Sequence, residues 1–133
     1  MRLALTLLSV AALAFAAPAA ADAPAEFPIL EVFPDTNPCT GAPMTVTFVG
    51  TAFVHEHGSR EVVRAERTIT TSDGFSGRGT DTFVSNGQVI VFRLADMLSN
   101  ASGDRFRAQN LFVLDLSTDT VRVERFQLTC LSK

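Results

Sequence analysis

The chain has 133 residues, with 11 Lys and Arg against 14 Asp and Glu, and therefore a formal net charge of −3 at pH 7. This length suits one domain, and the acidic balance argues against nucleic acid or an anionic membrane as the main partner. The only lysine is Lys133, so an internal lysine nucleophile or Schiff base is excluded. Tyr and Trp are absent, which leaves Phe as the main aromatic residue.

Residues 1–21 have the three-part pattern of a secretory signal peptide. Arg2 gives a positive start, residues 3–17 are mostly apolar, and small residues precede a cleavage site after Ala21. The apolar run is shorter than the about 20 residues that span a bilayer, and Pro18 ends it, so cleavage is favoured over a membrane anchor. We therefore predict a secreted or periplasmic protein whose mature chain has no membrane span.

A proline-rich N-terminal segment follows over residues 22–43, and it cannot form a helix. Phe27 and Ile29 would allow a short edge strand here. The rest of the chain, residues 44–133, is predicted to be a single β domain. The prolines of the segment are Pro24, Pro28, Pro34, Pro38 and Pro43.

From residue 44 onward, apolar and polar side chains alternate with a period of two, as expected for half-buried β-strands. Asp73-Gly74 and Asn86-Gly87 indicate hairpins, because glycine supplies the positive φ that a two-residue turn requires. Residues 61–67 and 93–98 would also suit helical turns, and that alternative stays open. The predicted strands cover residues 44–54, 61–71, 75–84, 89–95, 105–116 and 121–131.

The apolar face changes parity within the last predicted strand. Val121 and Val123 fall on one face, whereas Phe126 and Leu128 fall on the other. Parity cannot change within a regular strand, so one extra residue is needed to restore the apolar face. We therefore predict a β-bulge near residues 124–125.

Cys39 and Cys130 are the only cysteines, and in an exported chain they most simply form one disulfide. Two unpaired thiols are the alternative. An open sheet of six strands would hold its edges about 24 Å apart, whereas a disulfide needs Cα atoms within about 7 Å. We therefore predict an all-β fold, an antiparallel up-and-down meander of six or seven strands closed into a small barrel. A β-sandwich is the alternative.

The segment Asn37-Pro38-Cys39-Thr40-Gly41 leads into a Thr-rich strand, and the segment 126–130 ends the domain with a cysteine. This arrangement resembles a group of small secreted bacterial β proteins of unknown function with an N-P-C-x-G opening. The resemblance implies export, a disulfide and a β fold. It implies no catalytic residue.

Arg67 and Asn110 fall at positions that the pattern assigns to the inner face. A buried arginine needs a partner or marks a polar cavity, and a local error of register is the alternative. An apolar pocket with a few polar groups is the usual form of a small-molecule site, although a narrow barrel can also be filled by its own side chains. The candidate ligand-lining residues are Phe48, Arg67, Phe92, Phe106, Asn110 and Phe112.

His55 and His57 are two residues apart on a predicted strand, a spacing that can chelate a transition metal, with Glu61 as a conceivable third ligand. The alternative is that both histidines face solvent. The carboxylates, Asp81 and Asp96 among them, are scattered along the sequence, so no acid–base pair can be nominated without geometry.

These features favour an exported, non-enzymatic binding module for a small apolar ligand or a surface partner. One alternative is an envelope-associated structural or interaction protein. The other is a cofactor-free isomerase or cyclase that uses a barrel cavity, which would need titratable groups with shifted pKa values in one pocket. No cofactor is expected, and the oligomeric state is not indicated.

Overall fold

The computed structural model describes residues 23–131. The predicted signal peptide, with its cleavage after Ala21, lies outside the described residues. Between residues 23 and 131 there is no helix with the length and apolarity needed to cross a membrane.

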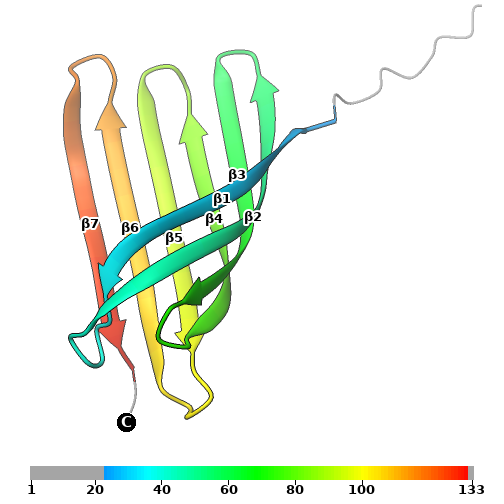
Figure 1. The fold of residues 1–133 in the computed structure, drawn as a ribbon. Coiled ribbons are helices and arrows are strands. Elements are labelled where there is room, and N and C mark those ends of the chain that lie inside the picture. Colours follow the sequence, from blue (N-terminus) through cyan, green and yellow to red (C-terminus); the bar gives the residue numbers. More distant parts are fainter. Residues whose placement is uncertain (1–22, 132–133) are drawn as a thin grey trace, which may run out of the picture.

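Seven antiparallel strands form one sheet in which the spatial order follows the chain (Figure 1). This confirms the all-β meander, and the helical alternatives for residues 61–67 and 93–98 are wrong. The strands are β1 (Ala25–Thr36), β2 (Pro43–His57), β3 (Arg60–Thr71), β4 (Ser76–Ser85), β5 (Val89–Ser99), β6 (Arg105–Asp115) and β7 (Thr120–Cys130).

Both predicted hairpins are present, with Gly74 at φ 93° and Gly87 at φ 83°. The predicted bulge is also present, slightly earlier than expected. Val113 pairs with Val123 and Leu114 pairs with Val121, so Arg122 is the extra residue of β7.

The proline-rich segment contributes far more than a short edge strand. β1 has 12 residues and pairs with β2 along its whole length, so residues 25–36 belong to the same sheet as the rest of the chain. An edge strand tolerates Pro28 and Pro34 because one of its sides needs no partner. Each proline also removes an N–H donor, which discourages pairing with a foreign strand.

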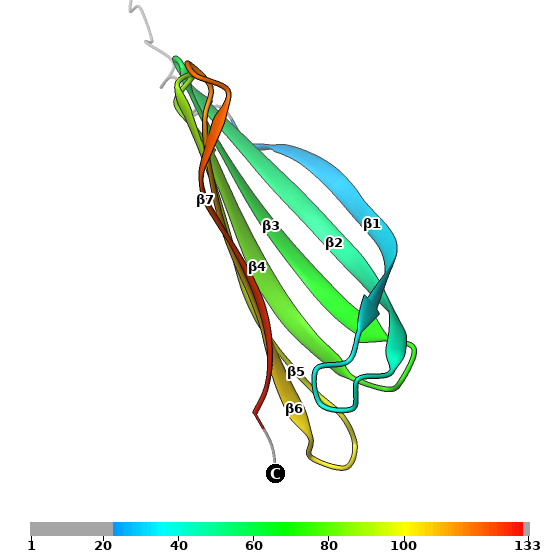
Figure 2. The same ribbon diagram turned by 90° about the vertical axis from the view of Figure 1, so that its left-hand side faces the viewer.

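No ladder joins β1 to β7 among the described strands, so the prediction of a closed barrel is not confirmed. The sheet is instead strongly curled, with β1 and β2 running diagonally across β5 and β6 and bowing away from β7 (Figures 1 and 2). The two edges are close only near the end of β7, where the predicted disulfide joins Cys39 to Cys130 with Cα atoms 4.9 Å apart.

The core lies on the concave face, at the end of the sheet that carries the disulfide. Phe75 and Phe106 pack with ring centroids 5.0 Å apart. Gly77 permits the close approach of β4 and β5, because a Cβ atom there would overlap the backbone carbonyl oxygen of Met97 on β5. The buried cluster consists of Met44, Val46, Ile69, Phe75, Leu98 and Phe106.

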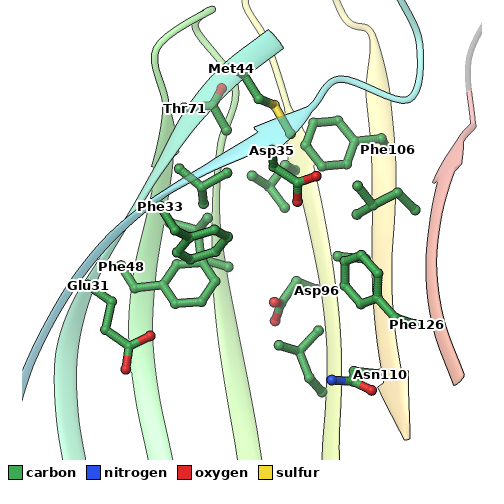
Figure 3. Close-up of a pocket in the computed structure, with 16 residues that line it drawn as sticks. Glu31, Phe33, Asp35, Met44, Phe48, Thr71, Asp96, Phe106, Asn110 and Phe126 are labelled. Carbon is green, nitrogen blue, oxygen red and sulfur yellow. The ribbon is translucent and has the colours of Figure 1, made fainter. Parts of the chain in front are cut away.

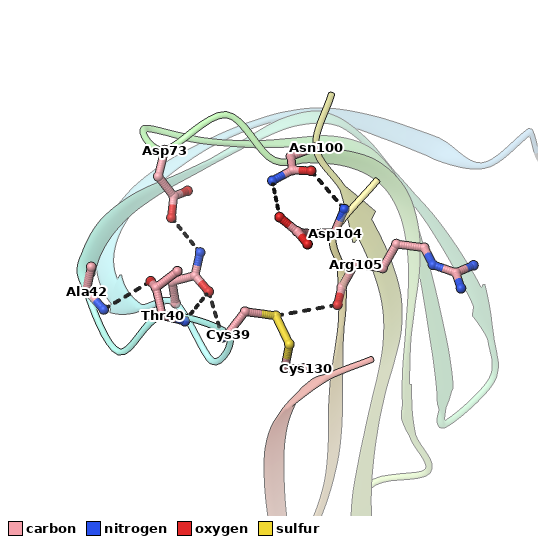
Figure 4. The surroundings of a disulfide bond; sticks show 9 residues. Cys39, Thr40, Ala42, Asp73, Asn100, Asp104, Arg105 and Cys130 are labelled. Atoms are coloured by element: carbon pink, nitrogen blue, oxygen red, sulfur yellow. Dashed lines mark hydrogen bonds between the residues drawn. A yellow bond between two sulfur atoms is a disulfide. The ribbon is translucent and has the colours of Figure 1, made fainter. Parts of the chain in front are cut away.

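The turn that carries Cys39 (Figure 4) is held by the side chain of Asn37, which is 1 % exposed. Its Oδ1 accepts hydrogen bonds from the backbone N–H groups of Cys39 (2.7 Å) and Thr40 (3.3 Å). Its Nδ2 donates to Asp73 on the β3–β4 turn at 2.6 Å. Burial alone would raise the pKa of Asp73, but hydrogen bonds from Asn37 and Thr71 lower it below the ordinary value. The N-P-C-x-G segment therefore presents one half of the disulfide in a fixed geometry.

Replacing both cysteines with serine is expected to lower the free energy of unfolding by about 4 to 5 kcal/mol, because the bond closes a loop of 91 residues in the unfolded chain. Urea unfolding of the parent and the double variant measures the difference. A loss below about 1 kcal/mol would show that the disulfide does not constrain the unfolded chain as this model requires.

Candidate binding site on the concave face

The concave face holds two neighbouring cavities, of about 230 Å³ and about 240 Å³. We call the first the disulfide-end cavity and the second the open-end cavity. Glu31 and Phe48 line both of them, so the cavities are two sections of one trough. Each section alone is slightly smaller than a typical drug-sized site of about 300 Å³ or more, and the shared walls give the trough additional length.

The disulfide-end cavity is mainly apolar, and phenyl rings form its walls (Figure 3). Phe33 and Phe48 meet edge to face with centroids 5.1 Å apart. Phe106 and Phe126 stand on the opposite side, and the carboxyl group of Asp96 lies between the two pairs of rings. Its other lining residues are Glu31, Asp35, Met44, Val46, Ile69, Thr71, Leu94, Leu98, Ala108, Asn110 and Leu128.

A buried ion triad lies between the two cavities. The guanidinium of Arg67, a residue 4 % exposed, donates from Nε to Asp81 at 2.7 Å and from Nη2 to Asp96 at 2.9 Å, and Nη2 also donates to Asp81. The ring of Phe48 covers this guanidinium, with Cζ 4.2 Å from the ring centroid. Arg67 therefore points inward, and a local error of register at this position is wrong.

The triad contains one cation and two carboxylates, so negative charge is in excess. Burial raises the pKa of Asp96, and the charge and hydrogen bond of Arg67 only partly oppose this rise. Burial would lower the pKa of Arg67, but its hydrogen bonds and its charge interactions with Asp81 and Asp96 raise it. Within residues 23–131, Arg67 Nη1 and Asp96 Oδ1 are buried without a hydrogen-bond partner.

Gly79 on β4 makes room for the triad. A Cβ atom at this position would overlap Asp96 Oδ1 and would lie 3.2 Å from Arg67 Nη2. The unpaired oxygen of Asp96 is thus packed against the backbone of β4.

The sequence-predicted lining residues divide between the two cavities. Phe48 lines both, Phe106 and Asn110 line the disulfide-end cavity, and Arg67 and Phe92 line the open-end cavity. Phe112 lines neither of these two cavities.

The sequence reasoning did not bring Asp81 and Asp96 together with Arg67. The signal that could have done so is the glycine at position 79, since glycine inside a strand often marks close approach by another group.

The two histidines lie at the end of β2, with ring centroids 6.4 Å apart and nearly parallel planes. Glu61 pairs with Glu56 in the register, whereas His55 pairs with Val62, so Glu61 belongs to the opposite face of the sheet. The proposed third ligand is therefore wrongly placed. The described residues contain no group of three or more His, Cys, Asp or Glu side chains that could hold a metal ion.

No protein-family model, curated protein sequence or solved structure matches this chain. The resemblance to small secreted bacterial β proteins stays a prediction.

Replacing Arg67 with Met is expected to lower the free energy of unfolding by about 3 to 5 kcal/mol, because it leaves two buried carboxylates without their cation. Denaturant unfolding at neutral pH measures the loss. An unchanged midpoint would contradict the buried triad.

The Asp96→Asn variant is expected to be more stable than the parent at neutral pH. The pKa of Asp96 is raised in the folded chain, so its ionisation costs stability as the pH rises from about 4, the unfolded value, through the folded pKa. Asn does not titrate, and the advantage should therefore vanish in acid. Unfolding midpoints at several pH values test this, with the exposed Asp119→Asn as the control that should show no such trend.

The Gly79→Ala variant is expected to be destabilised by about 1 to 3 kcal/mol through overlap with Asp96. Adding Asp96→Ala should recover part of that loss, with a coupling of roughly 0.5 to 3 kcal/mol in a double-mutant cycle. Additive losses in the cycle would show that the two side chains do not compete for the same space.

Proposed function

We propose that the protein is an exported, non-enzymatic binding module that takes an apolar ligand in the trough on its concave face. The observation that carries this proposal is the disulfide-end cavity, whose walls are phenyl rings and aliphatic side chains with few polar groups. Export is proposed from the N-terminal pattern, and the disulfide fits an oxidising compartment.

The charges of the trough indicate which apolar ligands it accepts. Glu31, Asp35 and Asp96 all line the disulfide-end cavity, and Arg67 is already held by two carboxylates. A free fatty acid would bring a further negative charge next to these groups. The proposed ligand is therefore neutral or cationic, with an apolar body.

A binding role is favoured over an isomerase or cyclase by the state of the polar groups. The pKa of Asp96 is shifted, as a catalytic acid requires. However, one of its oxygens accepts a hydrogen bond from Arg67 and the other is packed against Gly79, so neither is directed at a ligand. The triad thus acts as a structural floor for the trough.

Fluorescence of a bound probe tests the proposal without interference from Trp or Tyr emission, because the chain has neither residue. The neutral probe N-phenyl-1-naphthylamine is expected to bind saturably, and the anionic probe 8-anilinonaphthalene-1-sulfonate is expected to bind more weakly. Absence of saturable binding of the neutral probe would refute the proposal.

The Phe126→Ala variant is expected to weaken binding of the neutral probe several-fold. Phe126 is 58 % exposed and lines the disulfide-end cavity, so its removal takes away ligand contact with little loss of stability. Phe27→Ala is the matched control, because Phe27 is 54 % exposed and lines neither cavity. Equal effects of the two substitutions would place the probe outside the trough.

A further inference from the structure

The convex face of β3–β7 carries a set of arginines, which we call the arginine face. Cross-strand partners share one face of a sheet, and the residues opposite these arginines in the register are mostly Thr, Met and Leu. The side chains are exposed. Apart from Arg60 beside the β2–β3 turn, the arginines of this face are Arg64, Arg78, Arg93, Arg105, Arg107 and Arg125.

The register places three of these arginines in one line across the sheet. Arg64 pairs with Thr82, which pairs with Arg93, and Arg93 pairs with Leu111, which pairs with Arg125. The row therefore has an arginine on every second strand, at intervals of about 10 Å given the usual strand spacing.

A second, parallel row is shorter. Arg78 on β4 and Arg107 on β6 stand on either side of Met97. The two rows together distribute positive charge over most of the width of the sheet.

Carboxylates of the same face cancel only part of this charge. Glu66 pairs with Arg64 at 3.2 Å, and Asp115 pairs with Arg122. Within residues 23–131, Arg78, Arg93, Arg107 and Arg125 make no ion pair or side-chain hydrogen bond. The carboxylates of the trough, by contrast, lie on the concave side. The net charge of −3 thus conceals a separation of charge between the two faces.

The arginine face is also hollowed. A depression of about 440 Å³ lies between Arg93 and Arg125. Hydroxyl and amide groups line it together with the aliphatic Ala95 and Leu111, and no aromatic side chain does. The polar side chains that line it from the convex face are Thr80, Thr82, Gln109 and Gln127.

We propose that the arginine face binds a linear acidic polysaccharide that lies across the strands along the row Arg64, Arg93 and Arg125. Guanidinium groups bind carboxylate and sulfate in bidentate fashion. The Thr hydroxyls and Gln amides of the hollow can hydrogen-bond to sugar hydroxyls. The arginines of the row are regularly spaced, which suits a polymer that carries a negative group at regular intervals along its chain.

Other polyanions fit this face less well. Single-stranded nucleic acid is usually held by stacking of its bases on aromatic side chains, and the hollow offers none. An anionic membrane is a flat partner, and the floor of a depression would stand away from it. The site is distinct from the trough, so its proposal does not depend on an apolar ligand.

Calorimetry with oligogalacturonate and with heparin-derived oligosaccharides tests the proposal at low salt. Saturable binding is expected with at least one of them, with an affinity that falls as salt rises. The double variant Arg93→Gln/Arg125→Gln is expected to bind at least about tenfold more weakly, since hydrogen bonds between charged groups are lost.

Arg60→Gln is the matched control, because it removes an exposed positive charge beside the β2–β3 turn, outside both rows. Its affinity should stay within about twofold of the parent. The proposal is overturned if neither glycan binds, or if Arg60→Gln matches the loss per charge of the double variant. It is also overturned if duplex DNA or phosphatidylglycerol vesicles bind as tightly as the glycans. Probe binding in the trough should be the same in all of these variants, which separates this outcome from that of the proposed function.

Discussion

The disulfide between Cys39 and Cys130 is the constraint on which the concave architecture depends. A seven-stranded meander has two distant edges, and the covalent bond brings the β1–β2 turn to the end of β7. The sheet can satisfy that bond only by curling. Asn37 fixes the turn from the inside through its hydrogen bonds, so the curvature has a defined starting point. The trough is the space that this curvature encloses.

The curl is accommodated by small residues on the inner face. At Gly50, Gly77 and Gly79 a Cβ atom would overlap atoms of the neighbouring strand. Gly79 in particular gives space to Asp96, and the triad that Asp96 completes with Arg67 fills the middle of the concave face with paired charge. Two apolar cavities remain on either side. The packing of Asp96 against Gly79 therefore places the charged triad in the middle of the trough and an apolar cavity on each side of it.

Much of the fold could be predicted from the sequence, because alternation with a period of two depends only on which side each residue faces. The disulfide could be inferred from the predicted export and from there being two cysteines. Whether the sheet closes into a barrel could not be predicted from the sequence, since closure depends on whether β1 and β7 form a ladder. Pro28 and Pro34 weaken the ability of β1 to form one. The contact of Arg67 with Asp81 and Asp96 could not be predicted either. It depends on the register between β3, β4 and β5, and the sequence of one strand does not determine that register. The segregation of arginines was readable strand by strand, but the net charge hid it.

The gap between β1 and β7 has a mechanical consequence. In a closed barrel, enlarging the interior requires that backbone hydrogen bonds be broken. Here the Cys39–Cys130 disulfide connects the two edges of the sheet near one end, and β1 and β7 diverge from that point (Figure 1). The gap between β1 and β7 can therefore widen by bending of β1 and β2, without breaking the hydrogen bonds between neighbouring strands. For the ligand binding proposed above, such bending would let the trough accept apolar ligands of different width.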